Sequence, residues 1–279
     1  MLQNTFCHIP GVGPKAEQRL WEEGVRSWQD ACEDARLPLS PARCDLVRRH
    51  TEQSLERLAA GDARYFTDGL PSNLHWRLFP EFRHSTAYLD IETTGLGSAW
   101  DHITAIALYD GASVRTYVHG RNLDDFPSDV RDYRLLVSYN GKTFDVPFIE
   151  RYFGIRLRQA HVDLRYVLHS LGYKGGLKGC ERQLGMARGD LDGVDGFFAV
   201  LLWQDYLRTA DPRALETLLA YNVQDTVGLE TLMVMAYNMK VSGTAFADTH
   251  ALPLPDAPTT EFAPDLPTIN RIRMEHGWA

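Results

Sequence analysis

Two acidic residues alternate with apolar ones in the stretch YLDIETTGL, residues 88–96. Asp90 and Glu92 are two positions apart, so on a strand they point to the same face with Cα atoms about 6.5 Å apart. Two unpaired carboxylates in that arrangement repel each other and raise each other's pKa. A divalent cation relieves the repulsion, and hard oxygen ligands suit Mg²⁺ or Mn²⁺. A solvent-facing edge strand is the alternative that this stretch alone leaves open.

Two further acids lie later in the chain. Asp145 stands in VSYNGKTFDVPFIERYF, after a predicted strand and an Asn-Gly turn, where it is either a site residue or the N-cap of the next helix. Asp225 stands in LLAYNVQDTVGLETL, four residues after Tyr221, so the two share one face of a predicted helix. The apolar neighbours predict that this helix is buried, and a buried Asp needs a partner. The four acids therefore follow one another as Asp-x-Glu, Asp and Tyr-x-x-x-Asp.

The elements that must position these acids change in type along the chain. Short β-type runs at 86–92, 102–110, 113–120 and 134–140 predict strands, with Asp-Gly at 110–111 as a hairpin turn. A helix or irregular crossover is expected at 121–133, and the segment to about 240 is mostly helical. This order predicts a mixed α/β sheet, in which sites usually occur at strand ends and in the loops that follow.

Composition divides the chain into four expected parts. Residues 1–60 have helical spacing, and 61–85 are turn-rich and aromatic, as in a linker that packs onto the next domain. The main domain is expected at 86–240. Residues 241–279 form a tail with five prolines between Leu252 and Pro267, and we expect it to be extended and without a core of its own.

Taken together, the acids resemble the motifs of the DEDD (DnaQ-like) superfamily of 3′–5′ exonucleases, on the ribonuclease H-like fold. DIETTGL resembles its first motif, YNGKTFDVPFIERYF its second as found in proofreading domains of family-B DNA polymerases, and YNVQD its third in the DEDDy subgroup. HVDLR, GGLKGCERQLG and LLAYNVQDTVGLETL are similar to bacterial YprB-like exonuclease/ribonuclease H-like proteins. The resemblance covers residues 86–238 and implies a mixed five-stranded sheet flanked by helices, with a helical segment before it.

The resemblance also implies a two-metal mechanism and a role for each residue. Two Mg²⁺ or Mn²⁺ ions are expected, with Asp90 bridging both, Glu92 and Asp225 holding the one that activates water, and Asp145 holding the other. Tyr221 is expected to orient the attacking water. The implied activity is 3′–5′ exonuclease cleavage of single-stranded nucleic acid to nucleoside 5′-monophosphates. A metal-dependent endonuclease acting on structured or hybrid substrates and a non-catalytic nucleic-acid-binding module are the alternatives.

Charge is unevenly distributed, with a basic centre in an acidic chain. Ten Lys or Arg and four Asp or Glu lie between Arg134 and Arg188, a local net charge of +6, whereas the whole chain carries −8. This centre is either a track for a polyanion or a set of solvated surface charges. We expect the following residues near the acids to contact nucleic acid: Thr93, Asn140, Lys142, Lys174 and Lys178. A turn role for Asn140-Gly141, and a flexible loop in which Lys174 and Lys178 are solvated, are the alternatives.

The N-terminal stretch HIPGVGPKAEQRLWEEGV resembles a helix-hairpin-helix, whose hairpin glycines let backbone N–H groups face a phosphate. Gly11, Gly13 and Lys15 are the expected contacts. A Gly-Pro turn before an ordinary helix is the alternative. On the first interpretation the segment is a nucleic-acid-binding appendage, whereas on the second, or as a hairpin kept only for packing, it makes no contact with nucleic acid.

The remaining composition indicates a cytoplasmic location. The four cysteines show no CxxC spacing, which favours reduced thiols. No apolar run approaches the ~18 residues of a membrane span, and no secretory signal is recognisable at the N-terminus. The expected partner is nucleic acid and not a membrane, with DNA and RNA both open because the choice depends on how the pocket treats the 2′-hydroxyl.

Overall fold

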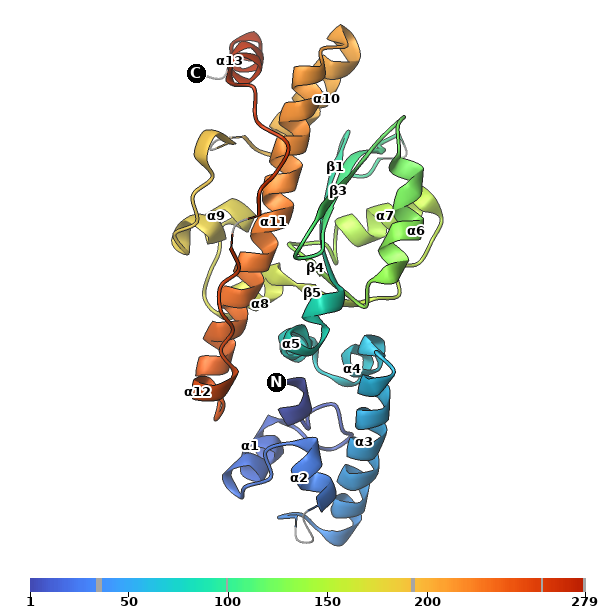
Figure 1. Cartoon of the computed structure of the whole chain (residues 1–279), viewed down its shortest axis with the longest axis vertical. Helices are drawn as coiled ribbons and strands as arrows, with labels where there is room; N and C mark the ends of the chain where they lie inside the picture. Colours follow the sequence, from blue (N-terminus) through green and yellow to red (C-terminus); the bar gives the residue numbers. More distant parts are fainter. Residues whose placement is uncertain (34–36, 99, 192–193, 257, 278–279) are drawn as a thin grey trace.

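A five-stranded mixed sheet forms the centre of the protein (Figure 1). The computed structural model describes residues 1–33, 37–98, 100–191, 194–256 and 258–277. The strand order is β3-β2-β1-β4-β5, with β1 antiparallel to β2 and parallel to β4. This arrangement confirms the predicted α/β fold. The strands are β1 (Thr86–Thr93), β2 (Ile103–Tyr109), β3 (Val114–Val118), β4 (Leu135–Ser138) and β5 (Ala160–Asp163).

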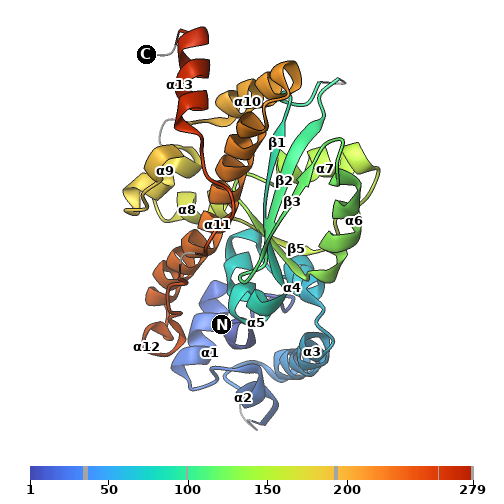
Figure 2. The same cartoon turned by 45° about the horizontal axis from the view of Figure 1, so that its top comes forward.

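Helices cover both faces of the sheet (Figure 2). Along β1, Leu89 and Ile91 pack in the core on the side of α6 and α7, whereas Tyr88 packs in the core beneath α11. This alternation follows from the two-residue period of a strand. It also directs the even-numbered Asp90 and Glu92 toward α11. The flanking helices are α6 (Phe126–Asp129) and α7 (Asp145–Phe153) on one side, and α8 (Leu164–Ser170), α9 (Gly176–Gln183), α10 (Gly196–Thr209) and α11 (Pro212–Ser242) on the other.

The longest helix, α11, crosses the sheet and contacts β1, β2 and β4. Asp211 caps its start by accepting a hydrogen bond from the Arg213 N–H at 3.0 Å, and Pro212 occupies its first position. Its apolar residues face the strands and α10, so the helix is held on several sides. Within the described part of the chain, no helix meets the length and apolarity needed to cross a membrane.

Residues 61–85, expected to be a turn-rich linker, are short helices with buried side chains. Phe66, Leu78 and Phe79 are fully buried, because this segment closes the core between the N-terminal helices and the sheet. The turn signals mark the breaks between helices that are each too short to show a clear period. The elements up to β1 are η1 (Leu2–Asn4), α1 (Pro14–Glu22), α2 (Trp28–Glu33), α3 (Pro41–Ala59), α4 (Ala63–Gly69), η2 (Ser72–Leu78), α5 (Phe79–Phe82) and η3 (Arg83–Ser85).

The N-terminal hairpin differs from a helix-hairpin-helix in what precedes it. A 3₁₀ turn, η1, comes before the hairpin in place of a first helix. Gly11 adopts a φ of +81° and Gly13 is the N-cap of α1. The glycines form a turn that starts α1, and contact of this turn with nucleic acid stays a prediction.

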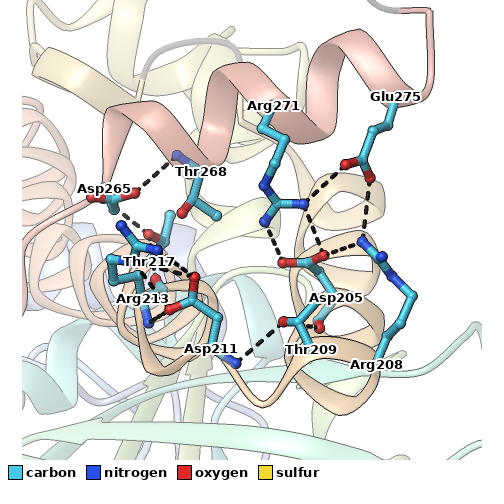
Figure 3. Close-up of polar contacts among 10 residues, drawn as sticks. All are labelled: Asp205, Arg208, Thr209, Asp211, Arg213, Thr217, Asp265, Thr268, Arg271 and Glu275. Carbon is cyan, nitrogen blue, oxygen red and sulfur yellow. Dashed lines mark hydrogen bonds and ion pairs between the residues drawn. The ribbon is translucent and has the colours of Figure 1, made fainter.

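The tail after α11 is not extended throughout, contrary to expectation. It includes α12 (Ala247–His250) and α13 (Leu266–Glu275), and Ile269 and Ile272 of α13 are buried in the core with α10 and α11. Figure 3 shows the polar contacts that fix α13, including Arg271, which donates to both oxygens of Asp205 at 2.6 and 3.0 Å. Residues 252–256 and 258–265 form no helix or strand, but two isoleucines three positions apart are enough to anchor a helix beyond them.

A buried ion pair joins the N-terminal helices to the rest of the protein. Glu17 of α1 is 1% exposed and pairs with Arg77 of η2 at 2.7 Å. Glu17 also accepts hydrogen bonds from the backbone N–H groups of Phe6 and Cys7 at 2.7 and 3.2 Å. Residues far apart in the sequence are thereby connected through one carboxylate.

Replacing Glu17 with Ala should lower the free energy of unfolding by about 3–5 kcal/mol, because Arg77 would remain buried without its partner. Urea unfolding measures this. The matched control is Glu23→Ala, an exposed acid that follows α1, which should change stability by about 0.5 kcal/mol or less. Equal losses in the two variants would contradict the role of the pair.

Candidate active site

The predicted catalytic residues line one cleft of about 1030 Å³ at the carboxyl end of β1. Asp90 and Glu92 come from β1, Asp145 from the first turn of α7, and Tyr221 and Asp225 from α11. The strand alternation and the register of α11 bring the three elements together. The structure therefore gathers all five side chains that the sequence selected.

The two acids of β1 carry mutually repelling charge in a poorly solvated place. Glu92 is 7% exposed. Burial, followed by repulsion from Asp145 and Asp225, raises the pKa of Asp90 well above its ordinary range. Burial and the nearby Asp90 act in the same direction on the pKa of Glu92. A cation bound beside these carboxyls would oppose both upward shifts in pKa.

Asp145 ties the start of α7 to the end of β1. Its Oδ1 accepts a hydrogen bond from the Ile91 backbone N–H at 3.3 Å, and the side chain is 4% exposed. Burial raises the pKa of Asp145 to about 7, although that hydrogen bond opposes the shift. The N-cap of α7 is Phe144, so Asp145 is not the cap that the sequence left as an alternative.

Asp225 is held by an arginine that the sequence did not single out. Arg188, itself buried, forms ion pairs with Asp225 and with Glu181 of α9. A second unexpected contact is made by Asn222, whose Nδ2 donates to Asp90 Oδ2 at 2.7 Å. Asn222 lies within YNVQD, next to Tyr221, but nothing in the sequence around Arg188 indicates its contact. The guanidinium of Arg188 thus neutralises part of the negative charge of the acidic cluster.

Tyr221 lies between positive groups and the acids. Burial and the nearby Asp225 and Glu92 raise its pKa, so the phenol stays protonated at neutral pH. The ammonium of Lys178 lies 4.5 Å from the centre of the Tyr221 ring and donates to the Val194 carbonyl. Burial lowers the pKa of Lys178.

The oxygen ligands in the cleft are of the type that a hard divalent cation prefers. The cleft offers four carboxylates, three of them with a pKa raised by burial, and such oxygens suit Mg²⁺ or Mn²⁺. Among the described residues, no three His, Cys, Asp or Glu side chains share a metal-binding arrangement as they stand. Asp225 is directed to Arg188 and Asp90 to Asn222, so cation binding requires these side chains to adjust.

Four of the predicted substrate contacts also line the cleft: Thr93, Asn140, Lys174 and Lys178. Asn140 has a φ of +67°, and Asp163 holds its loop by accepting from the Asn140 and Lys142 N–H groups at 2.8 and 3.0 Å. Asp163 also caps α8. Its role is to position the loop before Asp145.

The other predicted contacts lie elsewhere. The Lys142 side chain is not among those lining the cleft, and its ammonium influences the pKa values of His75 and His161. A loop position near Asp145 does not fix the direction of its side chain, which explains the difference. Gly11, Gly13 and Lys15 lie at α1, at the end of the molecule away from the carboxyl end of β1 (Figure 1).

Comparison with known proteins identifies one family. The family model of the RNase H superfamily matches residues 87–237. Among solved structures, the chain is similar to the family B DNA polymerase of the hyperthermophilic archaeon Pyrobaculum calidifontis, at 20% identity and a TM-score of 0.43. The similarity covers 60% of this chain and 27% of that one. A search of curated proteins gave no match.

Replacing Asp145 with Asn should stabilise the metal-free protein increasingly between pH about 4 and about 7. The unfolded carboxyl ionises near 3.8, whereas the folded one keeps its proton up to about 7. The Asp145 carboxyl of the parent therefore contributes a loss of stability as the pH rises through that window, and a neutral Asn at this position removes that contribution. Urea unfolding in a chelator measures the difference, and a difference that is independent of pH would contradict the raised pKa.

Proposed function

This chain belongs to the RNase H superfamily of nucleases, and we propose that it is a metal-dependent 3′–5′ exonuclease of single-stranded nucleic acid. Water attacks the terminal phosphodiester, the bond between phosphorus and the 3′ oxygen breaks, and that oxygen leaves as a hydroxyl. The products are a nucleoside 5′-monophosphate and a strand one nucleotide shorter.

The observation that carries the proposal is the cluster of carboxylates in the cleft. Protein cores do not keep several acids side by side without a compensating charge, because burial and repulsion both oppose ionisation. Ion pairing that stabilises the fold explains only part of the cluster, because Arg188 pairs with Asp225 but not with Glu92. A site built for cations and a phosphodiester accounts for all of them.

Asp90, Glu92, Asp145 and Asp225 would hold the two cations in this proposal. When bound, such ions supply Lewis-acid activation of the water and neutralise charge on the leaving oxygen. The carboxylates must ionise for this, so binding should release protons from those with a raised pKa. The protein's own contribution is to fix these oxygens on three rigid elements.

Tyr221 and Lys178 serve as positioning groups in the proposal. The raised pKa of Tyr221 excludes a phenolate base at neutral pH, so its hydroxyl acts as a hydrogen-bond partner that orients the attacking water. Lys178 places a positive charge beside the same ring. In the proposal, this charge stabilises the negative charge that develops on the phosphodiester oxygens during cleavage.

The lining of the cleft favours an unpaired strand as substrate. Leu96 is 94% exposed and Phe197 58% exposed, and both border the cleft together with Phe144 and Tyr173. Bases free of a duplex stack on such side chains, with a gain of about 1–3 kcal/mol per base. Apolar side chains at the border of the cleft suit a frayed or single-stranded 3′ end better than a base-paired duplex.

Replacing Asp90 with Asn should reduce cleavage by about 10²–10³-fold or more, because one expected ligand of both ions is lost. The assay is a gel time course with Mg²⁺ or Mn²⁺ on 5′-labelled single-stranded DNA and its RNA counterpart. The active protein should give a ladder that shortens from the 3′ end. The matched control is Asp124→Asn, an exposed acid on η4 (Leu123–Asp125), which should cleave like the parent.

Three outcomes of this assay contradict the proposal. Equal activity of the Asp90 variant and the parent excludes the carboxylate site. In a parallel reaction on an internally labelled circular single strand, cleavage replaces exonuclease action with endonuclease action. Tight strand binding without cleavage of any substrate leaves a binding module.

Replacing Tyr221 with Phe should lower kcat by about ten- to a hundredfold, because a misplaced nucleophile reacts more slowly. The hydroxyl is expected to orient water and not to bind metal, so Mn²⁺ affinity measured by calorimetry should match that of the parent. A variant with normal kcat and a raised KM would instead assign Tyr221 to strand binding.

A further inference from the structure

A second cavity, of about 1160 Å³, lies between the N-terminal helices and the sheet domain. We call it the arginine cavity. The turn from α3 to α4 borders it on one side, and the segments before β4 and β5 border it on the other. Figure 2 shows α4 near the start of β5, in agreement with the contacts between the two elements. The carboxylate cleft is at the opposite ends of the strands.

Six exposed arginines line the arginine cavity: Arg64, Arg131, Arg134, Arg151, Arg156 and Arg158. Two acids, Asp62 and Glu150, also line it, and Asp62 pairs with Arg57 at 3.2 Å. Arg156 pairs with Glu150 at 2.6 Å and Arg64 with Asp68 at 3.4 Å. In the described ranges, no carboxylate is within ion-pair distance of Arg131, Arg134 or Arg158. The guanidinium of Arg151 lies over the ring of Phe148 at 4.6 Å.

These arginines gather part of the basic centre of the sequence into one concave place. Arg134, Arg156 and Arg158 are in the stretch of net charge +6 in a chain of −8, and the fold adds Arg131 and Arg64. Like charges around one cavity repel each other, and an anion that fits the cavity removes the repulsion. Guanidinium groups bind phosphate oxygens through two parallel N–H donors, which an ammonium does not offer.

The backbone around the arginine cavity leaves room for a ligand. Gly154 has a φ of +65°, and a Cβ built there meets no atom within 4 Å. A Cβ at Gly61 meets only Arg134 Nε, at 3.9 Å. Gln159 Oε1 is a buried acceptor without a partner among the described residues, although its Nε2 donates to the Val130 carbonyl at 2.7 Å.

We propose that the arginine cavity binds the sugar–phosphate backbone of the nucleic-acid substrate, several nucleotides away from the reacting 3′ end. This inference rests on the proposed function, since the cleft supplies the reason for a strand to be present. β4 (Leu135–Ser138) lies between the two sites, and the six residues from Arg134 to Asn140 span at most about 20 Å at 3.3 Å per residue. Stacked nucleotides rise about 3.4 Å each, so up to about six of them separate the two sites.

The test compares two triple variants that remove the same charge. The cavity variant carries Arg131→Gln, Arg134→Gln and Arg158→Gln, and the control carries Arg19→Gln, Arg43→Gln and Arg49→Gln, exposed arginines outside the cavity. All proteins also carry Asp90→Asn to prevent cleavage. Fluorescence anisotropy measures binding of labelled single strands of about 30 and about eight nucleotides over a range of salt concentrations.

The cavity variant should bind the long strand at least tenfold more weakly than the control does. Its plot of log K against log salt should be shallower by about 2, since each lost phosphate contact on a single strand contributes about 0.7. The preference for the long strand over the short one should disappear. A variant with Lys at the same three positions should retain most of the salt slope, which excludes misfolding as the cause.

Long-strand affinities of the cavity variant and the control within twofold of each other would overturn the proposal, as would failure of the parent to bind any strand. Cleavage of a strand of about four nucleotides by the active protein tests the proposed function separately, because such a strand is too short to reach the cavity. Loss of binding in the cavity variant with no cleavage by the parent would support the cavity and reject the exonuclease.

Discussion

The structure depends on one constraint, the burial of several carboxylates beside one another. Glu92 and Asp145 are only slightly exposed, and each acid near them makes ionisation harder. The fold tolerates this because Arg188 neutralises part of the charge at Asp225 and Asn222 donates to Asp90. Because negative charge remains, we expect the cleft to bind cations. Cation binding to the folded state would raise the free energy of unfolding above that of the metal-free protein.

The rest of the molecule holds these acids in place. The two-residue period of β1 directs Asp90 and Glu92 to one face, and α11 passes over that face with Asp225. α13 packs on α10 and α11 and is fixed to α10 through Arg271 and Asp205. The N-terminal helices close the other end of the core through the Glu17–Arg77 pair. The segments outside the RNase H range therefore brace the domain and create the arginine cavity at its border.

The sequence predicted what depends on local pattern and missed what depends on long-range contact. Strands β1 to β4 and the acids were accessible because alternation and helical spacing are visible along the chain. β5 (Ala160–Asp163) is as short as β4, but its sequence AHVD lacks the continuous apolar run LLV that marks β4 as a strand. Arg188 meets Asp225 across 37 positions, and Lys142 turns away from the cleft, and neither follows from spacing. The basic centre was visible as charge, but only the fold shows where its arginines gather.

The central claim is that the carboxylate cluster is a seat for divalent cations, and calorimetric titration of Mn²⁺ tests it directly. The titration is made slightly below neutral pH in two buffers with different ionisation enthalpies, with the parent and Asp90→Asn. The account predicts saturable binding by the parent with release of protons, since the pKa of Asp145 is raised to about 7, and greatly weakened binding by the variant. Absence of binding, or equal binding by both proteins, would contradict it.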